Sequence, residues 1–240
     1  MAGHSQFANI KHRKNAQDSK RAKLFTKLLR EITVATKTGQ ADPEFNPRLR
    51  SAIIEAKSNN LPKDRIDAAI KKVVSGADSS NYVNIRYEGY SSSGIAVIVE
   101  ALTDNKNRTA GEVRSIFSKY GGSMGETGSV NFLFSHCGLI FFDQSITSYD
   151  ALFEFAIECN AIDVTNYDNC YYVFSAVDDF SSLRDKLILE YGDPLSSKLI
   201  WRPKDPVRLN DDDKINNLLN LVDSLQDLDD VTNIYTNFEE

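Results

Sequence analysis

The chain contains 240 residues, of which 41% are hydrophobic and 26% charged, a composition that is ordinary for a globular protein of one to three domains. No apolar run approaches the ~20 residues that span a bilayer, and the first residues lack the pattern of a secretory signal. We expect no transit peptide, because the residues that would be removed lead directly into a patterned helix. The three cysteines, Cys137, Cys159 and Cys170, form no CxxC pair, so the sequence predicts neither a disulfide framework nor a zinc knuckle. We therefore expect a reducing, cytoplasmic location.

The net charge of −6 conceals two segments of opposite sign. Residues 1–80 contain 16 Lys and Arg against 8 Asp and Glu, a net charge of +8. Residues 81–240 contain 12 Lys and Arg against 26 Asp and Glu, a net charge of −14. Such an asymmetry indicates a segment that faces nucleic acid, attached to an acidic body.

The first predicted element is a helix from Lys20 to Thr36 that ends before Gly39. Its apolar residues recur in an i, i+4, i+8 pattern with doublets and fall on one arc: Leu24, Phe25, Leu28, Leu29, Ile32 and Ala35. Its basic residues fall on the opposite arc: Lys20, Lys23, Lys27 and Arg30. We expect this helix to pack through one face and to carry a basic stripe on the other.

Two shorter helices are predicted to follow and to form a small bundle with the first. Asn46 and Pro47 supply the N-cap and first turn of one, whose inward residues are predicted to be Leu49, Ala52, Ile53 and Ala56. Pro62 begins the other, whose apolar row is Ile66, Ala69, Ile70 and Val73. Residues 75–80 are the predicted linker.

Beyond residue 80 the hydrophobic periodicity changes, and strands alternate with helices. Strands are predicted at 82–87, 95–102, 129–134, 139–142, 171–177, 199–201, around Val207 and at 231–238. Helices are predicted at 109–120, 150–159, 181–191 and 211–225, the first capped by Thr109 and ended by Gly121 and Gly122.

These elements predict an α+β fold of three domains. Residues 1–80 form the basic tail and helical domain. Residues 135–200 have the β-α-β-β-α-β order of a ferredoxin-like α+β domain. The flanking segments, 81–134 and 201–240, are predicted to close into a second ferredoxin-like α+β domain that is discontinuous, with residues 135–200 inserted in it.

The candidate nucleic-acid-binding residues lie between Lys11 and Lys27, where Asp18 is the only acid. They are Lys11, His12, Arg13, Lys14, Lys20, Arg21, Lys23 and Lys27. A cluster this dense repels itself unless phosphates or counterions neutralise it, and each cation placed on a phosphate adds affinity without reading the bases. Phe7 precedes the cluster and fits either stacking on a base or packing in the helical domain.

The remaining polar motifs are predicted to be structural. The stretch from Gly121 to Gly128 lacks the order of a phosphate-binding P-loop and follows a helix, so it is predicted to be a helix-terminating turn that leads into a strand. Asp104, Asn105 and Arg108 lie near the start of a helix, where charged residues usually cap the helix or are solvated.

No motif predicts a metal, a cofactor or catalysis. The aspartates at 211–213 and 227–230 lack the ligand spacing of a calcium loop. His136 and Cys137 are adjacent on a strand and therefore point to opposite faces, so they do not form a nucleophile–base pair. We therefore expect a protein that is not an enzyme and that needs no cofactor.

A series of longer motifs follows one another along the chain. The opening contains AGHS, ANIKHRK, AQD, KR and KLFTK between Ala2 and Lys27. The middle contains YEGY from Tyr87, LTDN from Leu102, NRTA from Asn107, and GG and GETGSV between Gly121 and Val130; the end contains DLDDV from Asp227 and YTNF from Tyr235. With these motifs in order, the chain resembles the YebC/PmpR family over essentially its whole length.

The resemblance implies a three-domain α+β fold with a helical N-terminal domain. It also implies a function, because bacterial members are described as cytoplasmic, DNA-binding transcriptional regulators. Related members, including the mitochondrial translational activator of cytochrome oxidase subunit one, act on translation.

We therefore expect a regulator of gene expression that binds nucleic acid. DNA and transcription are the first hypothesis. A ribosome-associated factor that contacts ribosomal RNA and relieves stalling is the second, and a protein–protein adaptor that uses the acidic body is the third. Neither a membrane nor a small-molecule substrate is expected as a partner.

Overall fold

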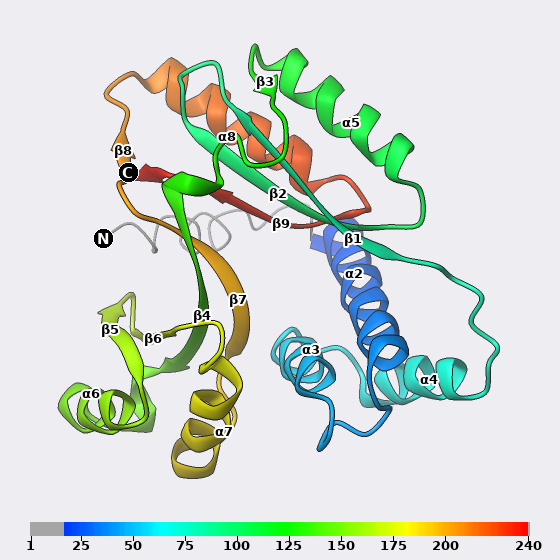
Figure 1. Ribbon diagram of the computed structural model, residues 1–240, viewed down its shortest axis with the longest axis vertical. Coiled ribbons are helices and arrows are strands. Elements are labelled where there is room, and N and C mark those ends of the chain that lie inside the picture. The colour runs from blue at the N-terminus through cyan, green and yellow to red at the C-terminus, as the bar shows by residue number, and fades with distance from the viewer. Residues whose placement is uncertain (1–16, 240) are drawn as a thin grey trace. The chain divides into compact units, whose positions relative to one another are not determined.

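The computed structural model describes the backbone of residues 17–239 and the side chains of residues 21–239 (Figure 1). The described residues fall into two compact units. The first contains the residues up to Lys27, Ser80–Ser135 and the segment from Trp201, and the second contains Leu28–Ser79 and His136–Ile200. The finer division into three domains stays a prediction. No helix among the described residues combines the length and apolarity that crossing a bilayer requires.

The first unit is built on a four-stranded sheet with the strand order β3-β1-β2-β9. Its strands are β1 (Val83–Tyr90), β2 (Ala96–Thr103), β3 (Ser123–Met124) and β9 (Val231–Thr236). The central strand β2 is antiparallel to both β1 and β9, and it is buried along its length except at Glu100. Two short strands, β8 (Val207–Arg208) and β10 (Phe238–Glu239), form a separate parallel pair.

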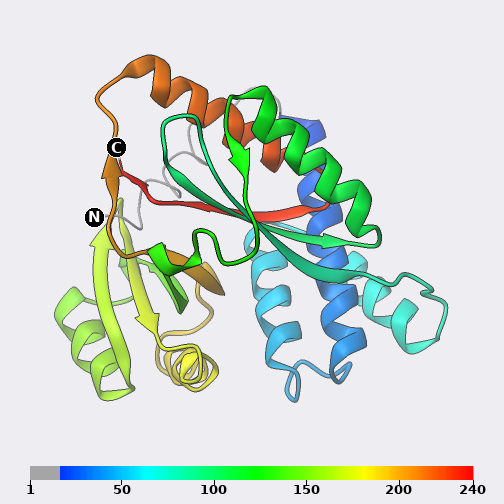
Figure 2. The same cartoon turned by 45° about the horizontal axis from the view of Figure 1, so that its top comes forward.

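Two helices cover one face of this sheet. They are α5 (Lys106–Lys119) and α8 (Asp212–Gln226), green and orange in Figure 2. Because side chains alternate between the faces of a strand, every second residue of β2 points toward these helices. The resulting core contains Val97, Val99 and Ala101 of β2, Val113 and Phe117 of α5, and Leu218, Leu221 and Leu225 of α8.

The second unit contains a helical part and a second four-stranded sheet. The helical part consists of α2 (Gln17–Thr38, in this unit from Leu28), α3 (Pro47–Ser58) and α4 (Lys63–Val74). The sheet has the order β5-β6-β4-β7. Its strands are β4 (Phe134–Asp143), β5 (Ala161–Tyr167), β6 (Cys170–Ser175) and β7 (Ser196–Pro203), with α6 (Tyr149–Glu158) and α7 (Phe180–Tyr191) closing its core.

The predicted α+β class is confirmed. The second sheet and its helices follow the order β4-α6-β5-β6-α7-β7, which is the β-α-β-β-α-β order predicted for residues 135–200, although no strand was predicted at the position of β5. The first unit has the order β1-β2-α5-β3, followed by β8-α8-β9. The two sheets are therefore connected differently, although each is packed against two helices.

Two predicted local structures around the first sheet are wrong. Residues 129–134 do not form a strand, because Asn131–Leu133 form a 3-10 helix and β4 begins only at Phe134. Thr109 does not cap α5, because the helix begins at Lys106 and Oδ1 of Asn105 accepts the cap hydrogen bond from the Arg108 amide at 3.1 Å. Thr109 lies one turn further on, where it is fully buried and its hydroxyl donates to Asp230.

The predicted inward face of α3 is incomplete. Leu49, Ala52 and Ala56 are buried as predicted, but Ile54 is buried and Ile53 is only half-buried. Because successive residues of a helix are ~100° apart, Ile54 lies ~140° around α3 from Leu49 and therefore on another side of the helix. That side also has packing partners, because Nη1 of the fully buried Arg184 of α7 donates to Ser51 Oγ at 2.9 Å and to the Pro47 carbonyl at 3.0 Å.

Asn46 joins the end of α2 to the start of α3, as the N-cap prediction requires. Its Oδ1 accepts from the Leu49 amide at 3.0 Å, and its Nδ2 donates to the carbonyls of Ala35 at 2.8 Å and Gln40 at 2.7 Å. The side chain is buried, and a Cβ on Gly39 would lie only 2.6 Å from Asn46 Nδ2. One amide therefore satisfies backbone groups at both helix ends, and Gly39 leaves room for it.

We predict that Asn46→Ala lowers the free energy of unfolding by about 2 kcal/mol, because a cap and two buried hydrogen bonds are lost together. Chemical denaturation followed by circular dichroism measures the change. The control is Asn59→Ala at the other end of α3, where Nδ2 donates to the Glu55 carbonyl at 2.8 Å and to the exposed Ser58 Oγ at 3.4 Å, and about 0.5 kcal/mol is expected. Equal losses for the two variants would contradict this role of Asn46.

Candidate nucleic-acid interface

Only part of the predicted basic cluster lies within the described residues. Lys11, His12, Arg13 and Lys14 lie outside them, as does Phe7, and the side chain of Lys20 is not described although its backbone belongs to α2. The three remaining predicted residues lie on the first turns of α2: Arg21, Lys23 and Lys27. Arg21 and Lys23 are exposed, whereas Lys27 is half-buried. The assignment of all eight residues to a binding site stays a prediction.

Lys23 and Lys27 are bound to the C-terminal end of α8 within the first unit. Nζ of Lys23 donates to the carbonyl of Asp227 at 3.0 Å, and Nζ of Lys27 donates to the carbonyl of Gln226 at 2.7 Å. Gln226 is the last residue of α8 and Asp227 is its C-cap. The carbonyls at a helix C-terminus lack partners within the helix and carry a partial negative charge, so a cation there stabilises the helix by about 0.3–1 kcal/mol.

Arg21 makes a different kind of contact. Its guanidinium carbon lies 5.2 Å from the centroid of the Phe25 ring, one turn further along α2. A guanidinium over an aromatic ring keeps the N–H donors at its edge, in the planar arrangement that suits a phosphate. Of the three described cations, Arg21 is therefore the one whose local contact is most compatible with a phosphate contact.

A buried carboxylate, Asp230, joins three elements of the first unit. Its Oδ2 accepts from Thr109 Oγ1 at 2.7 Å, from Thr103 Oγ1 at 2.9 Å and from Arg108 Nη2 at 2.6 Å. Arg108 also pairs with the exposed Asp104 at 2.9 Å. The LTDN and NRTA motifs thus meet the DLDDV motif at one carboxylate, where the sequence predicted only capping or solvation.

The hydrogen bonds at Asp230 determine its charge state. Burial by itself raises the pKa of Asp230, but the hydrogen bonds from Arg108, Thr109 and Thr103 outweigh burial and hold this pKa below its ordinary value. Burial, together with the negative charge of Asp230, raises the pKa of the neighbouring Tyr87 hydroxyl. An ionised carboxylate with three donors and 4% exposure has no proton to transfer and little access to a substrate, so this cluster holds the fold together.

A second buried carboxylate, Glu88 of the YEGY motif, organises the glycine-rich motif. Its Oε2 accepts from the amides of Val130 at 2.9 Å and Asn131 at 3.0 Å, and its Oε1 accepts from Arg86 Nε at 3.0 Å. Burial raises the pKa of Glu88, but these backbone amides and Arg86 lower it to below its ordinary value. The two motifs therefore form one structure, with a carboxylate on β1 and its amide partners in the segment after β3.

The glycines of this region allow backbones to approach closely. A Cβ on Gly89 would lie 2.5 Å from the Ser123 carbonyl, and a Cβ on Gly122 would lie 2.6 Å from the Tyr90 carbonyl. Gly121 ends α5 with a φ of +73°, and β3 then pairs with β1. The predicted helix-terminating turn is confirmed, but the strand β3 lies within the stretch, and a 3-10 helix follows it in place of the strand predicted from residue 129.

The aspartates near the ends of α8 have structural contacts as well. Asp211 caps the helix, since its Oδ1 accepts from the amides of Asp213 at 3.0 Å and Lys214 at 3.2 Å. Within residues 21–239, no group of three or more His, Cys, Asp or Glu side chains is arranged to hold a metal ion. None of the three cysteines, all of which lie within the described residues, forms a disulfide.

The same fold occurs in a solved structure. The crystal structure of a conserved hypothetical protein from Aquifex aeolicus matches with a TM-score of 0.86 and 39% identity, over 98% of this chain and 97% of that one. A relative from Rickettsia canadensis is 51% identical over 100% of this chain and 95% of its own length, and one from Ehrlichia ruminantium is 53% identical over 99% and 98%. Both are named probable transcriptional regulatory protein.

These names indicate a class of regulatory proteins rather than enzymes. The family models match nearly the whole chain: the TACO1/YebC protein N-terminal domain over residues 5–76, and the TACO1/YebC second and third domain over residues 82–238. The chain belongs to the TACO1/YebC family.

We predict that Asp230→Asn lowers the free energy of unfolding by about 2–3 kcal/mol at pH 7, because it disrupts a buried network of three donors around a charge. The folded-state pKa of Asp230 lies below its ordinary value of 3.8, so its contribution is present above about pH 4 and is lost as the pH falls through the folded-state pKa. The difference between wild type and variant is therefore expected to shrink on acidification.

Denaturation at pH 7 and near pH 3 measures both effects. Asp104→Asn is the control, because it removes the other carboxylate that binds Arg108 but is exposed, and a loss below about 1 kcal/mol is expected. A pH-independent difference for Asp230→Asn would argue against an ionised carboxylate at the centre of this network.

Proposed function

We propose that the chain is a regulator of transcription that binds DNA through its basic N-terminal segment and acts in the cytoplasm. The observation that carries this proposal is the placement of charge: the residues from Lys11 to Lys27 include seven Lys and Arg and one acid, in a chain whose net charge is −6. Phosphates attract such a segment, and the acidic body opposes binding elsewhere on the molecule. The regulatory names of the relatives from Rickettsia and Ehrlichia support the same assignment.

The contact is expected to be with the phosphate backbone. Lysine and arginine on one side of a helix contact phosphates in any sequence, whereas base reading needs side chains placed in a groove. Lys23 and Lys27 already bind the end of α8. We therefore expect Arg21 and the cations that precede it in the sequence to provide most of the affinity. Lys23 remains exposed and keeps further donors for a phosphate.

We predict that the triple variant Lys11→Ala, Arg13→Ala and Lys14→Ala makes the negative slope of log K against log salt shallower by about two to three, at ~0.7–0.9 per phosphate contact. Fluorescence anisotropy of a labelled duplex, titrated at several salt concentrations, measures the slope. The control replaces three exposed lysines of the acidic body, Lys106, Lys119 and Lys186, and so removes the same charge. If the control changes the slope as much as the triple variant does, the contact lies outside the N-terminal segment.

A second candidate function is that of a ribosome-associated translation factor that contacts ribosomal RNA and relieves stalling. The charge of residues 81–240, 12 Lys and Arg against 26 Asp and Glu, favours it, because so acidic a body is repelled by a long duplex but tolerates a local site for one basic arm.

Two measurements separate the candidates. Footprinting on promoter fragments is expected to give protection that survives an excess of random DNA if transcription is the function. If random DNA competes away all protection and the protein cosediments with stalled ribosomes at moderate salt, translation is favoured instead.

A further inference from the structure

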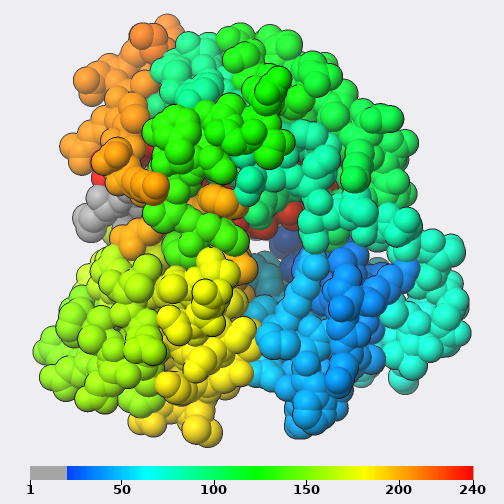
Figure 3. All heavy atoms as spheres, in the orientation of Figure 1, coloured from blue at the N-terminus to red at the C-terminus, as the bar shows by residue number. Residues whose placement is uncertain are grey.

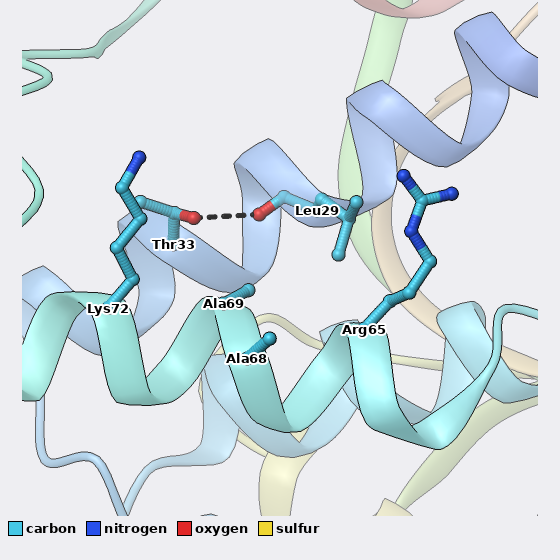
Figure 4. Close-up of a pocket in the computed structure, with 6 residues that line it drawn as sticks. All are labelled: Leu29, Thr33, Arg65, Ala68, Ala69 and Lys72. Carbon is cyan, nitrogen blue, oxygen red and sulfur yellow. Dashed lines mark hydrogen bonds between the residues drawn. The ribbon is translucent and has the colours of Figure 1, made fainter.

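A shallow groove lies between α2 and α4 in the second unit. Figure 4 shows its lining, and its volume is about 330 Å³. Leu29 and Thr33 of α2 form one side. The other side is formed by four residues of α4: Arg65, Ala68, Ala69 and Lys72. α4 lies at the surface, where it is cyan at the lower right of Figure 3.

The floor of the groove is small and apolar. Ala68 and Ala69 keep it shallow, and Leu29 is half-buried beside them. Thr33 Oγ1 donates to the Leu29 carbonyl at 2.9 Å, so this hydroxyl is already used inside α2 (Figure 4). The floor therefore offers van der Waals contact and few hydrogen-bonding groups of its own.

Two cations frame the floor. Arg65 and Lys72 are both exposed and extend from the same side of α4 (Figure 4). They are seven residues apart, which is two helical turns, or ~10.5 Å along the axis. The alanines lie between them in sequence, so the groove has a positive charge at each end and an apolar centre.

The cations are weakly compensated by acids. Arg65 makes no ion pair with any residue in the range 21–239. Lys72 lies 3.9 Å from Asp78, but that carboxylate is itself paired with Lys37 at 3.2 Å. The acids of α4, Asp64 and Asp67, are ~100° and ~160° around the helix from Arg65 and so face other directions.

We propose that this groove binds the sugar–phosphate backbone of a nucleic acid, with Arg65 and Lys72 on phosphates and the alanine floor against the sugar or base between them. The proposal rests on the nucleic-acid-binding function proposed above and adds a second contact region to the N-terminal segment. Arginine matches phosphate through two parallel hydrogen bonds, and lysine acts as a point charge.

The chemistry of the groove favours nucleic acid over an acidic peptide. A peptide helix is anchored by large apolar side chains that repeat along a hydrophobic groove. Here the apolar floor is short and lacks depth for such anchors, because two alanines form its centre. Separated charges with a small apolar surface between them suit a polyanion whose charges alternate with flat, partly apolar groups.

The test compares the full chain carrying Arg65→Ala and Lys72→Ala with the full chain carrying Lys63→Ala and Lys71→Ala. Both pairs remove two charges from α4, but Lys63 and Lys71 are ~160° and ~120° around the helix from Arg65. The probes are a labelled 25-nucleotide single-stranded DNA, its duplex and an RNA of the same sequence. The groove variant is expected to make the negative slope of log K against log salt shallower by about 1.4–1.8, and the control to make it shallower by less than about 0.5.

Two further variants keep the test informative if removing the charges disturbs folding. Arg65→Lys with Lys72→Arg keeps both charges and is expected to keep the wild-type slope. Ala69→Leu fills the groove without changing charge and is expected to weaken binding at an unchanged slope. Far-ultraviolet circular dichroism and thermal unfolding verify that each variant is folded.

The outcomes distinguish this inference from the proposed function. If the variant of Lys11, Arg13 and Lys14 loses affinity while the groove variant behaves like its control, the groove proposal is overturned and nucleic-acid binding stands. If the unmodified chain binds none of the three probes, both proposals fail. If the groove variant binds nucleic acid normally but loses binding to polyglutamate, the groove is a peptide site and the proposal is overturned.

Discussion

The first unit depends on the burial of two ionised carboxylates. A buried charge is costly unless donors surround it, and Asp230 and Glu88 are each provided with at least three. Asp230 connects β2, the start of α5 and the turn before β9, whereas Glu88 connects β1 to the loop that follows β3. The most distinctive motifs of the sequence supply these carboxylates and their donors. Their chemistry is therefore structural, and the residues suited to binding a ligand are the basic ones.

The basic residues differ in what they contact. Lys23 and Lys27 satisfy carbonyl groups at the end of α8, and Arg48 pairs with Glu31 at 2.7 Å. Arg21, Arg65 and Lys72 are exposed, and their contacts leave donors available to a ligand. A count of charges does not separate these groups, because the partners of Lys23 and Lys27 are backbone atoms about 200 residues away. The distinction matters for any experiment that replaces lysines to locate the interface.

Much of the fold could be predicted because its signals are local. Asn46 and Pro47 mark the start of α3, Gly39 follows the end of α2, and Asp211 caps α8, each within a few residues of the feature it determines. The failures have distant causes. Thr109 has a capping side chain, but its hydroxyl bonds to Asp230, 121 positions later. Residues 129–133 alternate like a strand, yet Glu88 binds the amides of Val130 and Asn131 where a 3-10 helix begins.

The site was less predictable than the fold. The tail residues were recognisable by charge density alone, but the groove depends on α2 and α4 lying side by side. The i, i+7 spacing of Arg65 and Lys72 was visible in the sequence, whereas the alanine floor and the scarcity of acidic partners for the two cations are properties of the packed helices. Charge spacing on a helix therefore becomes informative only when the neighbouring helix is known.

Hydrogen–deuterium exchange of the full chain, with and without a short duplex DNA, tests whether nucleic acid contacts the N-terminal segment and α4. We expect slower exchange in the N-terminal segment through the first turns of α2 and in α4, with residues 81–240 unchanged. Protection confined to residues 81–240 would contradict it, because the contact would then lie on the acidic body.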